Sequence, residues 1–135
     1  MFDLCTSLTS VDFNGNAPSI GSDVFDYDNK VTAYYLPGTT GWDDFALLTG
    51  VPTAPWLLPY PTILNFEPNF GVQTNSFGFT ISWATNISVV VEACTDLANP
   101  IWSPVGTNTL TDGSAYFSDP QWTNYPNRFY RLRSP

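Results

Sequence analysis

The chain has 135 residues, of which 16% are aromatic and only 12% are charged, and it contains 12 Pro. This length suffices for one domain and a partial unit, and this composition favours strands and turns over long helices. The formal net charge of −8 opposes binding to nucleic acid, and no stretch is long and apolar enough to cross a membrane as a helix.

The first forty residues contain a repeat. A shift of 23 places aligns apolar positions with one another: Phe2 with Phe25, Val11 with Tyr34 and Phe13 with Leu36. Such a period is typical of a solenoid, in which each coil buries its apolar side against its neighbours. Because so few coils are not stable alone, we expect the open edge that contains Leu8, Val11 and Phe13 to be covered by another element or chain.

Residues 37–50 follow as a predicted cap with a short helix. Pro37 and Gly38 favour a turn, Thr40 is a candidate N-cap, and Gly50 can end the helix. Three residues are expected on the inward face of that helix: Trp42, Phe45 and Ala46. Residues 1–50 are therefore predicted to form one unit.

Four Pro lie within residues 51–61, which forbids a helix and favours an extended, stiff connector. We place the boundary between the two parts of the chain in this segment.

Residues 2–11 read Phe-Asp-Leu-Cys-Thr-Ser-Leu-Thr-Ser-Val, and residues 18–25 read Pro-Ser-Ile-Gly-Ser-Asp-Val-Phe. This pattern resembles the BspA-type leucine-rich repeats of bacterial surface proteins, over residues 2 to about 27. Asp28 stands where the family would place its next Cys. The resemblance implies the last coils of a leucine-rich-repeat solenoid.

Residues 62–135 are predicted to be strands at short spacing. In residues 77–83, Phe77, Phe79, Ile81 and Trp83 alternate with Gly, Thr and Ser, and residues 88–94 are a β-branched run. Further strands are expected at residues 63–67, 71–74, 101–105, 107–110, 115–118 and 128–133, with a hairpin turn at residues 111–113. We expect a small antiparallel β-sandwich.

This part also resembles fibronectin type III-like or immunoglobulin-like modules, and most closely the C-terminal sandwich of secreted multidomain bacterial proteins. The resemblance rests on residues 80–83 and 90–97, on Trp102-Ser103-Pro104-Val105, on residues 113–119 and on residues 128–132. It implies an extracellular, non-catalytic role. A full module of this kind has one more strand after that of Phe129, so we expect an unpaired edge there.

Few residues suggest chemistry. With no His in the chain, the usual zinc sites and His-dependent triads are excluded. Asp23, Asp26 and Asp28 are a weak calcium candidate, but their spacing is not that of an EF-hand and solvated turn acids explain them better. Asp112 and Asp119 as paired catalytic carboxylates are a weaker idea than turn formation.

Cys5 and Cys94 have no CxxC spacing, and their apolar, strand-like contexts favour two buried thiols over a disulfide. No metal and no cofactor is predicted. The three Arg, at Arg128, Arg131 and Arg133, alternate with apolar residues and are expected to neutralise local Asp or Glu.

Three aromatic residues are candidate ligand-binding residues: Trp102, Trp122 and Tyr125. They lie in or beside loops rich in Pro and Asn, where exposed rings could stack on sugar faces. The alternative is that the rings plug the ends of the sandwich. For Trp102 the plug is the favoured interpretation. For Trp122 and Tyr125 both interpretations stay open, because they lie in the long connection at residues 119–126 and loops of this length often carry function.

We therefore expect a non-enzymatic binding or adhesion protein at the cell surface or outside the cell, with a protein or glycan ligand. One alternative is a structural subunit that assembles with further copies through the open edges at Leu8, Val11, Phe13 and Phe129. A second alternative is a carbohydrate-binding module. The first residues lack the features of a signal peptide, so an exported form would take its signal from upstream sequence.

Overall fold

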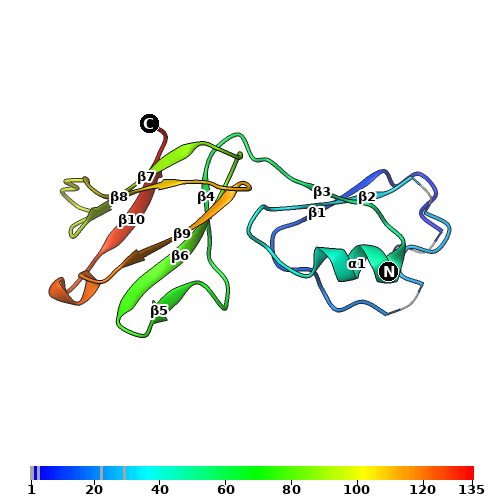
Figure 1. Ribbon diagram of the computed structural model, residues 1–135, viewed down its shortest axis with the longest axis horizontal. Helices are drawn as coiled ribbons and strands as arrows, with labels where there is room; N and C mark the ends of the chain where they lie inside the picture. Colours follow the sequence, from blue (N-terminus) through cyan, green and yellow to red (C-terminus); the bar gives the residue numbers. More distant parts are fainter. Residues whose placement is uncertain (1, 3, 22, 29) are drawn as a thin grey trace. The chain divides into compact units, whose positions relative to one another are not determined.

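The computed structural model describes residues 2, 4–21, 23–28 and 30–135. The chain is mainly β and divides into two compact units, Met1–Leu57 and Leu58–Pro135, each with its own apolar core (Figure 1). The sequence placed the boundary in residues 51–61, and the two units meet between Leu57 and Leu58.

The first unit contains three parallel strands, β1 (Ser10–Phe13), β2 (Thr32–Tyr35) and β3 (Thr53–Pro55), in that order (Figure 1). Val11 lies opposite Ala33, so the strands pair 22 residues apart. The predicted 23-residue shift would pair Val11 with Tyr34, whose side chain faces the other side of the sheet because strand side chains alternate. The 23-residue match does hold at Phe2 and Phe25, whose rings stack at 5.3 Å.

The segment predicted as a connector contains β3. The Ala33 N–H donates to the Pro52 carbonyl at 2.9 Å, and the Trp56 N–H donates to the Tyr35 carbonyl at 2.6 Å. Pro55 is compatible with β3 because β3 is an edge strand, and a residue whose N–H would point away from the sheet can lack that N–H without loss of a hydrogen bond. The prediction of a connector over residues 51–61 is therefore wrong for residues 51–57, which belong to the first unit.

Helix α1 (Trp42–Thr49) ends as predicted at Gly50, which adopts φ 71° and donates its N–H to Ala46. The prediction of Thr40 as the N-cap is wrong. Gly41 caps the helix with φ 89° and no side-chain bond, and the preceding Thr40 donates its backbone N–H to the Asn16 side chain at 3.0 Å.

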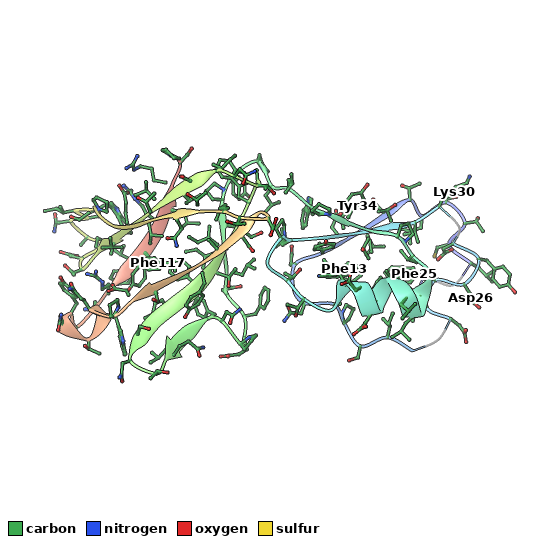
Figure 2. All side chains as sticks on the ribbon, in the orientation of Figure 1. Phe13, Phe25, Asp26, Lys30, Tyr34 and Phe117 are labelled. Atoms are coloured by element: carbon green, nitrogen blue, oxygen red, sulfur yellow. The ribbon has the colours of Figure 1, made fainter. Side chains whose placement is uncertain are left out.

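The buried rings of α1 fix its inward face. Trp42 and Phe45 are buried, as predicted, and Phe45 makes edge contacts with Phe13 and Phe25 at 5.6 and 6.0 Å. Figure 2 shows Phe13 and Phe25 on the side of the sheet that faces α1, with Tyr34 on the other side. This aromatic cluster is the centre of the first core.

The second unit contains two antiparallel sheets that share one core (Figure 1). One sheet has the order β10-β7-β8, with bounds Phe129–Arg133, Ser88–Cys94 and Ser103–Thr109. In the other sheet β6 (Ser76–Ser82) pairs with β9 (Ser114–Asp119) on one side and with both β4 (Thr62–Leu64) and β5 (Gly71–Gln73) on the other. Phe79 and Ile81 of β6 meet Val89 and Val91 of β7 in the core, an arrangement consistent with the predicted sandwich.

Strand β8 corrects one prediction. The sequence predicts two strands, 101–105 and 107–110, whereas the structure has a single strand, Ser103–Thr109. Val91 pairs with Gly106 and Glu92 with Pro104, so the register shifts by one residue at Val105. A β-bulge at Val105 therefore lets one strand continue through Gly106, the residue at which the two predicted strands were divided.

The predicted turn at residues 111–113 is present, but it does not join two neighbouring strands of one sheet. Asp112 and Gly113 adopt φ 55° and 83°, and Thr111 and Ser114 form an isolated antiparallel bridge. The turn connects β8 of one sheet to β9 of the other. It therefore closes one side of the sandwich.

Candidate functional site

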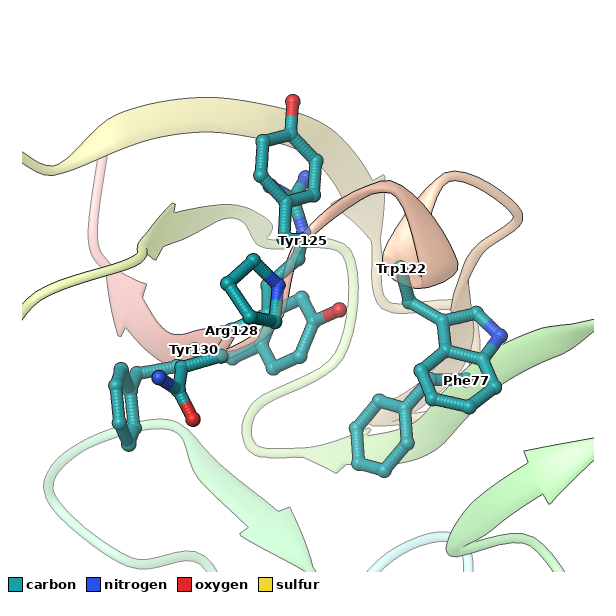
Figure 3. Close-up of a pocket in the computed structure, with 8 residues that line it drawn as sticks. Phe77, Trp122, Tyr125, Arg128 and Tyr130 are labelled. Carbon is teal, nitrogen blue, oxygen red and sulfur yellow. The ribbon is translucent and has the colours of Figure 1, made fainter.

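The three predicted ligand-binding aromatics gather at two adjoining hollows in the second unit. The first, here named the Trp122 pocket, has a volume of about 320 Å³ and is lined by Trp122, Tyr125, Phe77, Arg128, Phe129 and Tyr130, together with Pro126 and Asn127 (Figure 3). The second, here named the Trp102 pocket, has a volume of about 400 Å³. Its lining includes Ile63, Phe70, Leu97 and Trp102, and it shares Phe77, Arg128, Phe129 and Tyr130 with the first.

The connection between β9 and β10 carries the two rings of the Trp122 pocket. It contains a short 3-10 helix, Trp122–Asn124, and Tyr125 follows that helix in an extended conformation. Figure 3 shows Trp122 and Tyr125 projecting from different parts of this connection. Trp122 is half-buried and Tyr125 is 38% exposed, so both rings are partly open to solvent.

Asp119 fastens both ends of that connection. One carboxylate oxygen, Oδ1, accepts the N–H of Gln121 at 2.9 Å, at the start of the connection. The other, Oδ2, accepts Arg128 Nε at 2.5 Å and the Tyr130 hydroxyl at 3.0 Å, at its end. Asp119 is 5% exposed, so these bonds are shielded from water. The turn role predicted for Asp119 is confirmed, and the same contacts position Trp122 and Tyr125.

The ionisable groups at this point stabilise one another. Burial alone would lower the pKa of Arg128, but the hydrogen bond and the charge of Asp119 outweigh burial and raise that pKa above its ordinary value. Burial, together with the hydrogen bond to Asp119 and its charge, raises the pKa of Tyr130 to about 12. Arg128 therefore stays charged and Tyr130 stays neutral at any ordinary pH.

Aromatic contacts form the floor that the two pockets share. The rings of Phe77 and Tyr130 stack at 5.3 Å with an interplanar angle of 8°. The Arg128 guanidinium lies 4.1 Å from the centre of the Tyr125 ring, close enough for a cation–π contact. Phe70 packs edge-on against Phe77 at 5.7 Å. The walls of both hollows are therefore mostly aromatic rings, and the charged Arg128 in their lining is paired with Asp119.

Trp102 contacts a separate charge cluster on β7 and β10. The Arg131 guanidinium lies 4.4 Å from the centre of the Trp102 ring and bonds to Glu92 at 2.7 Å. Arg133 bonds to the other oxygen of Glu92 at 3.0 Å. The hydrogen bond from Arg131 lowers the pKa of Glu92 against the opposing effect of burial, and Arg133 adds to this decrease. The prediction that the three Arg neutralise local acids is confirmed, with Asp119 as the acid for Arg128.

The structure does not bring the calcium candidates together. Asp23 and Asp26 are exposed, whereas Asp28 is 6% exposed. Within residues 2, 4–21, 23–28 and 30–135, no group of three or more His, Cys, Asp or Glu side chains is arranged to hold a metal ion. Asp112 is exposed in its turn while both oxygens of Asp119 are occupied, so the two do not act as a free carboxylate pair.

The two thiols differ. Cys94 is buried at the end of β7, as predicted, but Cys5 is exposed and the prediction of burial is wrong for it. Cys5 lies in a turn where its N–H donates to Phe2 and its carbonyl accepts the N–H of Leu8, so its apolar neighbours do not form a strand around it. Both Cys are free.

The candidate assembly residues fall into two environments. Leu8, Val11 and Phe13 are partly buried against the core of the first unit, and β1 is an edge strand of its sheet. Phe129 is 36% exposed at the start of β10 and lines both pockets.

Several site residues were not identified from sequence as such. Phe77 was predicted only as a core residue and Leu97 only as part of the resemblance to a C-terminal sandwich, and no role was predicted for Phe70. The local signals in the sequence were a long connection rich in Pro and aromatic residues and the expectation that Arg128 neutralises a nearby acid.

No protein-family model, curated protein or solved structure matches this chain. In the part of the chain that the structure describes, no helix has the length and apolar character needed to span a membrane.

Proposed function

We propose that the protein is a non-catalytic binding or adhesion protein and that the Trp122 and Trp102 pockets are its ligand-binding surface. One observation carries this proposal: three aromatic residues from two separate loops converge on adjoining pockets whose shared floor is the stacked pair Phe77 and Tyr130. Fixed aromatic walls of this size suit recognition of a ligand, since binding pockets are mostly apolar and begin at about 300 Å³.

The charges near the pockets favour binding over catalysis. Arg128 is committed to Asp119, and the raised pKa of Tyr130 removes it as a base at neutral pH. A general acid or base needs a pKa near the working pH and a free path to the substrate. Neither requirement is met by this trio, which is consistent with a role in shaping the site.

The test is a screen of glycans and proteins against the purified chain, followed by substitution of the ring residues. Trp122→Ala and Tyr125→Ala should each weaken binding at least tenfold, because a stacked ring contributes much of the affinity in such sites. Tyr60→Ala is the matched control, since Tyr60 is 59% exposed and lines neither pocket. A ligand bound equally well by Trp122→Ala and Tyr60→Ala would refute the proposed site. A glycan hit would favour the carbohydrate-binding alternative.

We further propose that the first unit is the capped end of a leucine-rich-repeat solenoid of an extracellular or cell-surface protein. The parallel pairing of β1 with β2, the Phe2–Phe25 stack and the helix that covers the aromatic cluster support it. Protease or label added to intact source cells tests the location, and protection of the chain until lysis would refute it.

Self-assembly is a second candidate function, favoured by the edge positions of β1 and β10 in their sheets. Edge strands present unpaired backbone groups that a second copy can satisfy, and head-to-tail contacts of this kind extend into filaments when they do not close. Light scattering over a wide concentration range tests it. A constant monomer mass would exclude assembly, whereas growth of large species would support it.

A further inference from the structure

Strand β10 has one unpaired side. It pairs with β7 from Phe129 to Arg133, and no strand in the part of the chain that the structure describes pairs with its other edge. The backbone N–H and C=O groups along such an edge can accept an added strand.

The Trp102 pocket lies on the open side of the sandwich. The turn at Thr111–Ser114 joins β8 to β9 and closes the opposite side, which leaves β10 of one sheet facing the β4 and β5 side of the other. The pocket lining is consistent with this arrangement, because it takes Ile63 from β4 and the core-facing Tyr130 from β10. An unpaired backbone edge and an apolar hollow of about 400 Å³ therefore adjoin.

We infer that β10 and the Trp102 pocket form an acceptor site for an extended segment of another protein, apolar at alternate positions, which pairs with β10 as an added strand. Strand side chains alternate between the two faces of a sheet. One alternate set would therefore enter the space between the sheets near Ile63, Phe70 and Phe77, and the other would lie on the outer face beside Arg131 and Arg133. This inference rests on the proposed binding function and names its partner.

The charges on the outer face of β10 indicate which residues the added segment should carry on that face. Arg131 and Arg133 have side chains 48% and 51% exposed, and they share the single carboxylate of Glu92. The outer face of β10 thus has one positive charge in excess on a chain whose net charge is −8. Cross-strand pairs of opposite charge are favourable, so the accepted segment should carry Asp or Glu on its outer positions.

A synthetic peptide tests this chemistry directly. The probe is a capped peptide of about seven residues, a usual strand length, in which Val and Glu alternate. Binding to the full chain is measured by calorimetry. Leu97→Glu should weaken binding at least tenfold, because Leu97 lines the pocket and is 56% exposed. Ile101→Glu is the matched control, since Ile101 is 82% exposed and lines neither pocket.

Methylation of the peptide backbone distinguishes strand pairing from binding through apolar side chains alone. An added strand uses only alternate backbone N–H groups toward β10, so N-methylation of one alternate set should abolish binding and methylation of the other should change it less than threefold. Arg133→Glu should weaken the Glu peptide at least threefold, and a peptide with Lys in place of Glu should bind that variant better than the original chain. Equal loss from both methylated sets, or no peptide binding, would overturn the inference.

The outcomes separate this inference from the proposed function. Failure of every peptide, alongside a screened ligand whose binding depends on Trp122, would refute the added strand and leave the binding function standing. Failure of the peptides together with the absence of any Trp122-dependent ligand would refute both. A mass that rises with concentration and is lowered by the peptide would identify a second copy as the occupant and overturn the assignment to another protein.

Discussion

Replacing Asp119 by Ala should both destabilise the second unit and release the loop of the Trp122 pocket. The change removes the acceptor for Gln121, Arg128 and Tyr130 in one step. Arg128 is left with a side chain that is only 11% exposed and with no acidic partner. A buried charge without its partner is strongly unfavourable, and this term should dominate the effect.

The expected loss is about 3 kcal/mol in the free energy of unfolding, at the lower end of the range for breaking a buried pair. The lower end applies because the long Arg128 side chain can turn partly toward solvent. With a urea dependence of about 2 kcal/mol per M, the midpoint should fall by about 1.5 M. Replacing both members of the pair, as Asp119→Ala with Arg128→Met, should recover more than half of the loss, since no charge is then stranded.

The assay is urea unfolding followed through the amide NMR signals of β6 and β7, which report the second unit alone. Asp112→Asn is the control, because Asp112 is exposed and the change should cost no more than about 0.5 kcal/mol. A midpoint for Asp119→Ala that equals that of the control would refute the reasoning. Loss of Trp122-dependent ligand binding in Asp119→Ala, but not in Asp112→Asn, would confirm that Asp119 positions the loop.

Three further predictions concern single residues. The pKa of Tyr130 in the folded chain, about 12, exceeds its unfolded value, so the phenol stabilises the fold fully below about pH 10 and this contribution is lost as pH rises toward 12. The free energy of unfolding should therefore fall less steeply over that pH range in Tyr130→Phe than in the original chain. Identical pH dependence in the two proteins would contradict this prediction. Gly78→Ala should lower the free energy of unfolding by about 1–3 kcal/mol, measured with urea, since its Cβ would lie 2.8 Å from the Phe117 carbonyl oxygen of the neighbouring strand β9. An unchanged urea midpoint would show that β6 and β9 can separate freely. Gly50→Ala should cost about 1 kcal/mol in the first unit because Gly50 has φ 71°, measured by thermal unfolding, whereas a gain in stability would mean that the helix end rearranges.

Some features were predictable because they depend only on neighbouring residues. The alternation of Phe77, Phe79 and Ile81 predicts a strand, and that strand is the centre of its sheet. Gly50 ends α1 because a left-handed residue is required there and Gly adopts it without strain. Asp112 and Gly113 form the predicted tight turn for the same kind of reason.

Other features depend on residues far apart in the chain. The Trp102 pocket combines Ile63 with Trp102 and Phe129, and no local pattern relates these positions. The predicted register of β1 against β2 was wrong by one residue. The 23-residue spacing holds for Phe2 and Phe25, which precede the strands, whereas the strands themselves pair at a spacing of 22 residues. Pairing across a sheet depends on which faces become buried, and burial is a property of the whole unit.

The sequence by itself determined a mainly β chain, several of its turns, its short helix and the three aromatic residues that border the candidate site. Local steric preference and the period of apolar side chains encode these features directly. Only the tertiary structure decided that Trp102 and Trp122 adjoin a common floor and that Asp119 holds both ends of the connection between β9 and β10. It also decided that β10 pairs with β7 alone among the strands of the described residues and lies beside an apolar hollow. These features arise from the packing of two sheets, in which distant residues become neighbours through the burial of a shared core.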